Sequence, residues 1–451
     1  MFHKVLVANR GEIAVRIIRA LREMGIRSVA VYSEADRDAL HVMLADEAVC
    51  IGPAPSTESY LNMDSIISAA VVMGAEAIHP GFGFLSENAK FANLCTMCGI
   101  KFIGPSAEVI EKAGNKSEAR NTMQKAGVPV IPGTHAPVFD AKTALKAAKK
   151  IGFPVMIKAS SGGGGRGMRV AESAEHFEEL FNAAQLESIK GFSDDSMYIE
   201  KYIRNPRHIE FQILADSFGN IVHLGERDCS IQRRHQKVLE EAPCDAISPQ
   251  LRTRMGKVAV KAAKAVGYES AGTIEFLLDD GKKFYFMEMN TRIQVEHPIT
   301  ELVTGIDLVK EQIRIAAGEK LPFTQKDIAI TGHAIECRIN AENPEKHFMP
   351  SPGRITDVHL PGGNGVRVDT HIYADYKVPP NYDSLLLKLC VHGKDRSEAI
   401  AKMRSALGEL VIEGPDTNID FEYDIVNHKA FETGKISTDF IETCFPAYTA
   451  R

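Results

Sequence analysis

The stretch from Met287 to Pro298 combines residue types that could bind a charged ligand. Read at the two-residue period of a strand, its polar residues fall on one face and the residues between them are apolar or nearly so. The polar residues are Glu288, Asn290, Arg292, Gln294 and Glu296. Such alternation alone is typical of a half-exposed surface strand. This face, however, contains no lysine, serine or threonine, and its carboxylates, amides and guanidinium suit a cation beside an anion.

A second apolar run, Ala271–Leu278, should place another carboxylate beside this face. The run is followed by Asp279-Asp280-Gly281-Lys282, and Asp-Gly between two apolar runs is a strong hairpin signal. A loop of two or four residues would make Glu275 and Glu288 opposite or diagonal neighbours on one face. Two carboxylates that close repel unless a cation lies between them or one takes up a proton. With the amide oxygen of Asn290, the donors are all hard oxygen atoms, which favours Mg²⁺ or Mn²⁺ bridging to phosphates over zinc.

A glycine-rich segment provides a candidate phosphate site. The strand-like run Pro154–Lys158 leads into Ala159-Ser160-Ser161-Gly162-Gly163-Gly164-Gly165-Arg166-Gly167, and a second short strand, Met168–Val170, follows. The alternative is a flexible linker, but linkers rarely lie between two tight strands, and each glycine costs roughly 0.5–1 kcal/mol relative to alanine. We interpret the segment as a hairpin lid whose backbone N–H groups close over phosphates above Lys158. It is not a Walker loop, because no Gly-Lys-Ser/Thr opens a helix here.

The elements that precede these motifs alternate between strand and helix. Apolar runs predict strands near residues 5–8, 28–32, 48–51, 77–79 and 102–103, with a helix that stops at Gly25 and others near 62–73 and 88–98. This rhythm implies a doubly wound parallel sheet. Ala8-Asn9-Arg10-Gly11-Glu12 lacks the three spaced glycines of a dinucleotide site. The run His79–Phe84 follows a strand end, where open α/β sheets bind ligands, but its glycines could equally serve a turn.

The later segments supply further donors. A helical connector over 104–130 contains Asn115-Lys116-Ser117, with Asn115 or Ser117 as its expected cap. The donor-rich run Gln232–Lys237 fits a solvated basic loop, and beside an acidic metal site it fits anion binding as well. Helices are expected at 250–266 and 396–409, the latter inside a strand–helix–strand stretch. Arg338 falls on the polar face of a strand over 334–340, where it could also pair with a carboxylate across the sheet.

Composition limits the classes of protein. Four parts are expected: 1–103, 104–130, 131–202 and 203–451. The net charge of -6 argues against a general nucleic-acid binder, and no apolar run approaches the length of a membrane span. The N-terminus enters a strand directly, so no signal or transit peptide is visible. Eight scattered cysteines, with only Cys95 and Cys98 as a lone Cys-x-x-Cys, are typical of a cytoplasmic protein.

Several of these motifs resemble those of biotin carboxylases. The lid from Lys158 to Val170, and the pairing of Glu275 with Glu288-Met289-Asn290, are similar to those of ATP-grasp enzymes. Longer stretches look specifically like biotin carboxylase, and together the resemblance covers essentially the whole chain. These stretches are Ala8–Ala14, His79–Asn88, Glu226–Pro243 and Asn290–Gly305. One departure is Leu387, where the family usually has a small residue, and this position concerns packing far from the chemistry.

The resemblance implies an α/β (α+β) ATP-grasp fold with an N-terminal doubly wound domain, a central glycine-rich lid domain and a C-terminal mixed-sheet domain. It also implies a ligase in which ATP phosphorylates bicarbonate to carboxyphosphate, whose CO2 is captured by N1 of biotin. The parent complex would be acetyl-CoA carboxylase in fatty acid synthesis or, alternatively, a pyruvate or other acyl-CoA carboxylase. The implied partners are a biotin carboxyl carrier protein, carboxyltransferase subunits and a second copy of the chain. Biotin carrier domains attach biotin to a lysine between two methionines, and the only Lys-Met here, Lys402-Met403, follows Ala401, so no biotin is expected on this chain.

The resemblance also implies roles for individual residues. Two Mg²⁺ or Mn²⁺ ions would be held against the triphosphate by Glu275, Glu288 and Asn290. ATP would be bound by Lys116, Lys158, Gly164, Gly165, His208, Gln232 and His235, with Glu200, Lys201, Tyr202 and Ile203 presenting backbone to adenine. Bicarbonate would be held by Lys237, Arg292, Gln294 and Val295. Glu296 would remove its proton, and Arg338 would face biotin.

Two other functions remain open at this point. Another ATP-grasp ligase would share the lid and the metal pair but use a different acceptor around Arg292–Glu296 and Arg338. A non-catalytic nucleotide-binding protein would keep the lid and lose the metal carboxylates or the base.

Overall fold

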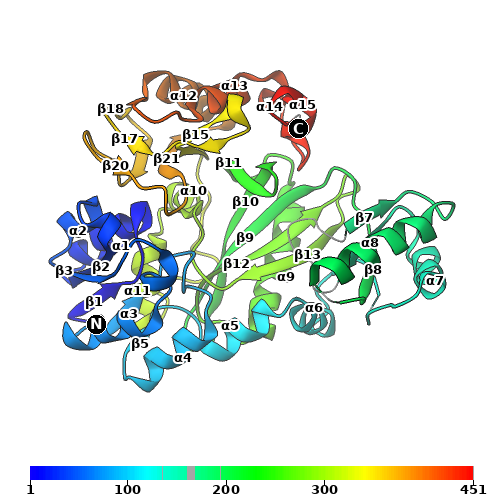
Figure 1. The fold of residues 1–451 in the computed structure, drawn as a ribbon, viewed down its shortest axis with the longest axis horizontal. Coiled ribbons are helices and arrows are strands. Elements are labelled where there is room, and N and C mark those ends of the chain that lie inside the picture. The colour runs from blue at the N-terminus through cyan, green and yellow to red at the C-terminus, as the bar shows by residue number, and fades with distance from the viewer. Residues whose placement is uncertain (135, 160–167, 193, 450–451) are drawn as a thin grey trace. The chain divides into compact units, whose positions relative to one another are not determined.

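The computed structural model describes residues 1–134, 136–159, 168–192 and 194–449, and its elements are labelled in Figure 1. The chain forms two compact units. The larger unit comprises Met1–Val128, Arg207–Phe276 and Glu288–Arg451, and the smaller unit comprises Pro129–Pro206 and Leu277–Met287. The division into four parts at 103, 130 and 202 remains a prediction.

The N-terminal part of the larger unit is built on a five-stranded parallel sheet, as predicted. Its strand order is β3-β2-β1-β4-β5, so the order reverses between β1 and β4. The strands are β1 (Lys4–Val7), β2 (Arg27–Ser33), β3 (Glu47–Gly52), β4 (Ala77–His79) and β5 (Lys101–Phe102), and the first three are blue in Figure 1. Helices α1 (Gly11–Glu23), α3 (Met63–Val72) and α4 (Ala89–Met97) connect them.

Both faces of this sheet are covered by helices, and the central strand β1 is apolar on both faces. Val5 and Val7 pack with the inward residues of α1, whereas Leu6 packs with those of α3 and α4 on the other face. A continuous apolar run is what a parallel strand covered by helices on both sides requires. Helix α1 ends before Gly25, whose φ of +70° suits a helix C-terminus.

The helical connector contains α5 (Ala107–Gly114) and α6 (Lys116–Lys125). Of the two expected caps, the Asn115 side chain accepts the hydrogen bond from the Glu118 backbone N–H, so Asn115 is the cap of α6.

A second sheet has eight strands in the order β13-β12-β9-β10-β11-β14-β21-β19. From β9 through β10, β11, β14 and β21 to β19, neighbouring strands are antiparallel. Its strands are β9 (Arg207–Ala215), β10 (Ile221–Arg233), β11 (Gln236–Ala242), β12 (Ser270–Leu278), β13 (Phe284–Asn290), β14 (His333–Asn340), β19 (Val366–Thr370) and β21 (Leu385–Gly393). Helices α9 (Pro249–Ala265), α10 (His297–Thr304), α11 (Leu308–Ala316), α12 (Arg396–Glu409) and α13 (Ile419–Asn427) accompany it. Leu387 is fully buried in the core formed by β14, β21 and α12, which explains why a large apolar residue is accommodated there.

One prediction about this region was wrong in detail, and another was confirmed. Strand β13 ends at Asn290 instead of continuing to Val295, because residues 291–296 bend and turn into α10, whose first turn contains Pro298. The expected strand–helix–strand stretch is present as β21, α12 and β22 (Val411–Glu413), but β22 pairs with β18 (Asp357–His359) outside the eight-stranded sheet.

The smaller unit contains a three-stranded antiparallel sheet in the order β7-β6-β8. Its strands are β6 (Val155–Ala159), β7 (Met168–Ala171) and β8 (Met197–Lys201), with helices α7 (Ala141–Ile151) and α8 (Phe177–Phe192). Alternate residues of β6 are fully buried against Phe177 and Phe181. The glycines Gly162–Gly165 lie outside the described residues, so the lid remains a prediction, although the flanking strands β6 and β7 pair with Lys158 opposite Met168.

Short elements complete the described chain: α2 (Leu40–Leu44), β15 (Glu342–Asn343), β16 (Met349–Pro350), β17 (Gly353–Arg354), β20 (Lys377–Val378), α14 (Lys429–Glu432), α15 (Phe440–Cys444) and α16 (Pro446–Thr449). Among the helices that the structure describes, none is both long and apolar enough to cross a membrane. The cysteines are free thiols, with Cys95 buried and Cys98 exposed on the lone Cys-x-x-Cys.

Candidate active site

Glu296 lies between two cations at the start of α10. Its Oε1 is 2.5 Å from Lys237 Nζ, and its Oε2 is 2.9 Å from Arg338 Nη2. The carboxylate is 1% exposed. Burial alone would raise the pKa of Glu296, but Lys237 and Arg338, with Arg227 behind them, outweigh burial and hold that pKa well below its ordinary value. Glu296 is therefore ionised over the whole neutral range.

Lys237 is the ammonium at the centre of three carboxylates. Besides Glu296, its Nζ lies 2.5 Å from Glu210 Oε2 and 3.4 Å from Glu275 Oε1. Burial would lower the pKa of Lys237, and the surrounding acidic groups reverse this and raise it well above its ordinary value. A permanent positive charge at this position can attract an anion.

The donor-rich run Gln232–Lys237 forms a hairpin whose middle residues are exposed to solvent. Arg234 and His235 both have positive φ, as the central residues of a type I′ turn between β10 and β11 do. The turn leaves His235 exposed, whereas Gln232 is buried and its Nε2 lies 2.6 Å from His208 Nδ1.

Glu275 is the carboxylate on which the predicted metal site depends. Its Oε1 accepts hydrogen bonds from Asn290 Nδ2 at 2.6 Å and Gln294 Nε2 at 2.8 Å, and its Oε2 lies 2.8 Å from His208 Nε2. Burial would raise the pKa of Glu275, but Lys237 and His208 outweigh it and keep that pKa well below its ordinary value. The structure thus brings Asn290, Gln294 and His208 around the ionised carboxylate of Glu275, each with a nitrogen atom towards it.

Glu288 and Val295 complete the predicted set on this side. Glu288 is half-buried on β13, two residues before Asn290, so both side chains leave the same face of the strand. Val295 lies in the turn before α10, and its carbonyl accepts a 2.8 Å hydrogen bond from Lys388.

Arg227 links this site to the sheet, and no motif in the sequence pointed to it. It is fully buried and donates to Glu210 Oε1 at 2.6 Å and to Gln294 Oε1 at 2.8 Å. Further bonds to Gln212 and Thr300 use its other donors. The available signal was a run of three charged residues, Glu226-Arg227-Asp228, within a strand, because charged residues that are buried require partners.

Arg292 meets a carboxylate from the N-terminal part. Its Nε is 2.8 Å from Glu87 Oε2, and its Nη2 donates to Asn290 Oδ1 at 3.2 Å. Glu87 also accepts from the Thr291 backbone N–H at 3.1 Å. This arrangement compensates for the early end of β13: the turn carries Arg292 and Gln294 back towards Asn290 and Glu275, so the side chains still converge without a continued strand.

Arg338 forms the ion pair across the sheet that was one of its two possible roles. Its Nε donates to Glu240 Oε1 at 2.7 Å on the neighbouring strand β11. The same guanidinium also reaches Glu296, so the ion pair and a position at the site are compatible. The sequence did not identify Glu240 as this partner.

The predicted ATP contacts of the smaller unit form a local group of their own. Lys158 Nζ lies 2.5 Å from Glu200 Oε2 on the adjacent strand. Lys201 Nζ donates to two backbone carbonyls, and the Tyr202 N–H donates to Pro154 O, just before Ile203. Gly164 and Gly165 lie outside the described residues, as does the side chain of Lys116. The roles of these residues towards ATP remain predictions.

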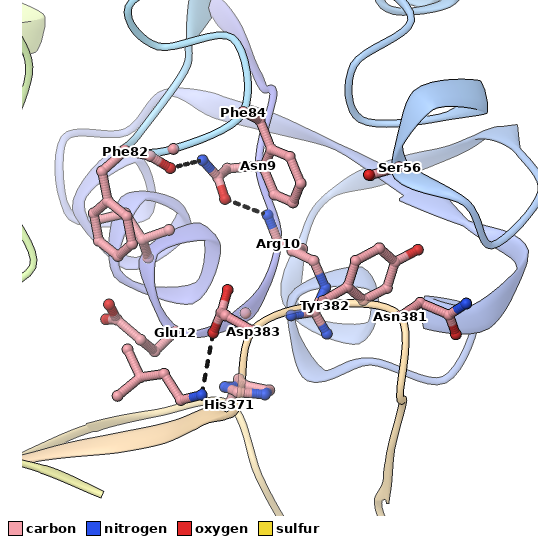
Figure 2. A pocket seen from close by; sticks show the side chains of 14 residues that line it. Asn9, Arg10, Glu12, Ser56, Phe82, Phe84, His371, Asn381, Tyr382 and Asp383 are labelled. Carbon is pink, nitrogen blue, oxygen red and sulfur yellow. Dashed lines mark hydrogen bonds between the residues drawn. The ribbon is translucent and has the colours of Figure 1, made fainter. Parts of the chain in front are cut away.

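A pocket of about 330 Å³ lies where β1 and β4 end, at the reversal of strand order in the parallel sheet. Figure 2 shows Asn9 turned to Phe82, and its Nδ2 donates 2.7 Å hydrogen bonds to Pro80 O and Phe82 O. The Arg10 guanidinium lies 4.3 Å from the centroid of the Tyr382 ring. Gly81 has φ +62°, and a Cβ there would come within 2.9 Å of Asn9 Nδ2, so this glycine serves the turn. The pocket is lined by other residues than the cluster around Glu296.

Comparison with known proteins agrees with this arrangement. Family models match residues 1–110 (biotin carboxylase, N-terminal domain), 115–324 (carbamoyl-phosphate synthase L chain, ATP binding domain) and 336–443 (biotin carboxylase C-terminal domain). The parallel-sheet domain and the match to an ATP-binding domain define an ATP-grasp ligase. The chain is 59% identical to biotin carboxylase of Nostoc sp. over 98% of its own length and 99% of that protein. The chain belongs to the biotin carboxylase family and is an ATP-dependent ligase.

Two further relatives are similar to this chain over nearly its whole length. Biotin carboxylase 1 of Bacillus subtilis is 56% identical over 98% of this chain and 99% of that protein. A pyruvate carboxylase polypeptide of Methanothermobacter thermautotrophicus is 57% identical over 98% of this chain and 90% of that protein.

Solved structures agree with the fold. A biotin carboxylase–ATP complex from Campylobacter jejuni superposes with a TM-score of 0.92 at 51% identity, over 98% of this chain and 99% of that one. The biotin carboxylase domain dimer of 2-oxoglutarate carboxylase from Hydrogenobacter thermophilus, in complex with MgADP, ADP and bicarbonate, gives 0.91 at 50% identity over 99% of both chains.

Proposed function

We propose that this chain carboxylates biotin on a carrier protein, with ATP and bicarbonate as co-substrates and carboxyphosphate as the intermediate. The observation that carries the proposal is the position of Glu296 between Lys237 and Arg338. A buried carboxylate flanked by two cations can take a proton from an anion that those cations attract. The parent complex we propose is acetyl-CoA carboxylase, which supplies malonyl-CoA for fatty acid synthesis.

Bicarbonate is bound beside this base. Lys237 and Arg292 provide positive charge, and Gln294 and the backbone of Val295 complete the site. Two anions, bicarbonate and the γ-phosphate, must approach each other, and fixed cations lower the energy of that encounter. Glu296 then removes the bicarbonate proton and makes the oxygen a better nucleophile.

The donors around Glu275 fit a divalent cation. Carboxylate and amide oxygens from Glu275, Glu288 and Asn290 are the hard ligands that Mg²⁺ and Mn²⁺ prefer. Glu275 accepts N–H donors on Oε1 and lies beside His208 at Oε2, and a bound cation would take the place of these contacts. Two such ions, when bound, supply positive charge against the triphosphate. Glu275 and Glu288 contribute to the ATP site in this way.

ATP is held from several elements. Lys116, Lys158, Gly164 and Gly165 contact the phosphates, and a closed glycine lid protects carboxyphosphate from water. His208, Gln232 and His235 contribute further contacts. The backbone of Glu200, Lys201, Tyr202 and Ile203 faces adenine.

Arg338 stabilises the charge that develops on biotin. Carboxylation at N1 requires loss of a proton, which moves negative charge onto the ureido oxygen. A guanidinium cannot deprotonate and offers donors in a fixed fork, so it stabilises that oxygen better than a neutral donor.

Biotin reaches the site on a separate carrier protein, and carboxyltransferase subunits and a second copy of this chain are the other proposed partners. Lys402, which begins the only Lys-Met, lies on helix α12, where its Nζ donates to His392 O at 2.8 Å. A lysine held on a helix in this way is a poor biotin attachment site. Covalently attached biotin detected by mass spectrometry on this polypeptide would contradict the assignment.

One assay separates this function from its alternatives. A biotin carboxylase hydrolyses ATP in a bicarbonate-dependent manner that free biotin stimulates. Another ATP-grasp ligase would show no stimulation by biotin, and a non-catalytic nucleotide-binding protein would show no turnover. The acyl acceptor follows from reconstitution with the carrier and carboxyltransferase partners, by comparing acetyl-CoA with pyruvate. The pyruvate carboxylase polypeptide among the relatives makes pyruvate the second candidate.

A further inference from the structure

Two consecutive glutamates on β11, Glu240 and Glu241, each form an ion pair with a different arginine. Glu240 is paired with Arg338, whereas Glu241 is paired with Arg396, whose Nε lies 2.7 Å away. Both glutamates are buried, at 0% and 4% exposure. Because successive residues of a strand point to opposite faces, only Glu240 faces the site.

Glu240 contacts one edge of the Arg338 guanidinium. Its Oε1 accepts from Nε at 2.7 Å and lies 2.5 Å from Nη2. Nη2 also reaches Glu296 at 2.9 Å. Within the part of the chain that the structure describes, Nη1 has no protein hydrogen bond, so it is the nitrogen left for a ligand. The Arg338 side chain is 17% exposed, so it can be reached from the site.

We propose that Glu240 is a positioning residue for biotin carboxylation: it holds the Nε–Nη2 edge of Arg338 so that Nη1 is presented to the ureido oxygen. This inference rests on the biotin role proposed for Arg338. Glu240 itself touches no substrate and acts only through the arginine. Arginine has several rotatable bonds, and a side chain fixed in advance binds a ligand at lower entropic cost.

The charges around Glu240 support a role separate from that of Glu296. Burial raises the pKa of Glu240 to about 7, against the lowering effect of Arg338. Glu240 Oε2 is buried and has no protein hydrogen-bond partner among the described residues, so it can carry the proton. The groups that act on this carboxyl are Arg338, Glu296, Lys237, Glu336, Glu422, Cys229 and Cys337. Arg338 thus contacts two carboxyl groups that differ in charge. Glu296 stays ionised, whereas Glu240 takes up a proton near neutral pH.

The test uses Glu240→Met, which removes the acceptor at nearly constant volume. We expect kcat/KM for free biotin to fall by about 10–100-fold, the order expected for a displaced catalytic group. The KM for ATP should change less than twofold, and biotin-independent, bicarbonate-dependent ATP hydrolysis should fall much less than the biotin kinetics, because Lys237 still contacts Glu296. Glu240→Gln keeps an acceptor for Nε and should restore most of the biotin kinetics. If the methionine variant does not fold, Glu240→Asp, which retracts the carboxylate by one methylene, should show the same loss.

Glu241→Met is the matched control, because it removes an equally buried, arginine-paired carboxylate from the adjacent position. It should lower stability and leave the ratio of biotin-dependent to biotin-independent activity unchanged. An equal loss of this ratio in Glu241→Met and Glu240→Met would indicate a general effect on the sheet and overturn the proposal.

A double-mutant cycle with Arg338→Gln separates this inference from the function on which it rests. If Glu240 acts through Arg338, Glu240→Met should add less than twofold in the Arg338→Gln background. A folded Arg338→Gln variant with normal biotin carboxylation would refute the proposed role of Arg338 itself. An impaired Arg338→Gln beside a normal Glu240→Met, or losses that multiply in the double variant, would refute only the role of Glu240.

Discussion

Lys237 Nζ lies 2.5 Å from Glu296 Oε1, and this contact keeps the proposed base ionised but weakly basic. A carboxylate whose pKa is held well below its ordinary value has little tendency to take a proton. Bound bicarbonate and triphosphate would draw Lys237 towards their own negative charges. Glu296 would then lose part of its cationic surroundings, and its basicity would rise when the substrates are in place.

The pH dependence of turnover tests this coupling. The kcat/KM profile reports groups of the free enzyme, and the kcat profile reports those of the substrate complex. We therefore expect the acidic limb assigned to Glu296 to lie at higher pH in kcat than in kcat/KM for bicarbonate. The measurement is steady-state ATP hydrolysis from about pH 5.5 to about pH 9 at saturating and limiting bicarbonate. Coincident acidic limbs would show that substrate binding leaves the base unchanged.

Glu296→Gln should reduce bicarbonate-dependent turnover by about 10²–10⁴, the usual contribution of a general base. The amide has nearly the same shape but cannot accept the proton. ATP affinity should stay within a few-fold of the wild-type value, because Glu296 is not part of the proposed nucleotide contacts. Turnover and equilibrium ATP binding can be measured on one preparation. Wild-type turnover in this variant would place the base elsewhere.

Arg227→Met should destabilise the fold by roughly 3–5 kcal/mol, because it leaves the fully buried Glu210 without one of its two cations. It also removes the 2.8 Å bond that orients Gln294. Urea denaturation gives the loss in the free energy of unfolding. Arg354→Met is the matched control, since the Arg354–Asp375 pair is 66% and 71% exposed and should contribute less than about 1 kcal/mol. Equal stabilities of the two variants would mean that the buried network contributes little.

Glu241 should make stability depend on pH in a defined window. Burial would raise its pKa, but His333 and Arg396 outweigh burial and lower that pKa to about 2, from 4.5. Between these values the unfolded chain binds more protons than the folded one, so this contribution is complete above pH 4.5 and is lost as the pH falls towards 2. The stability difference between wild type and Glu241→Gln should shrink by about 1.4 kcal/mol per pH unit below pH 4.5. Urea titrations from about pH 6 to about pH 3.5 measure it, and a constant difference would contradict the assignment.

The sequence was sufficient for the parts of the structure that periodicity specifies. Continuous apolar runs predicted the parallel sheet, and Asp-Gly between two runs predicted the β12–β13 hairpin. Periodicity gives the face of a strand but not the residue opposite it. Glu240 therefore could not be named as the partner of Arg338, although the two lie on adjacent strands.

The other features that the sequence did not predict were missed for the same physical reason. Alternation continued past Asn290 in the sequence, but Pro298 favours a helix start, and the chain had already turned by then. Glu87 and Arg292 are 205 residues apart, and no local pattern can pair residues at such a distance. Arg227 is explained only by the acceptors that tertiary packing brings around it.

Lys388 gives the last prediction, because it connects the turn before the proposed base, Glu296, to strand β21 of the sheet. It is fully buried on β21, and its Nζ donates to Val295 O at 2.8 Å and lies 3.1 Å from Glu12 Oε2. Lys388→Met removes the anchor of this turn, so the KM for bicarbonate should rise about tenfold while the KM for ATP changes little. Lys402→Met is the control, since it also removes a lysine bond to a backbone carbonyl, at His392, without touching the turn. The measurement is the KM for bicarbonate of the two variants. The same KM in both would show that the fold holds Val295 in place without Lys388.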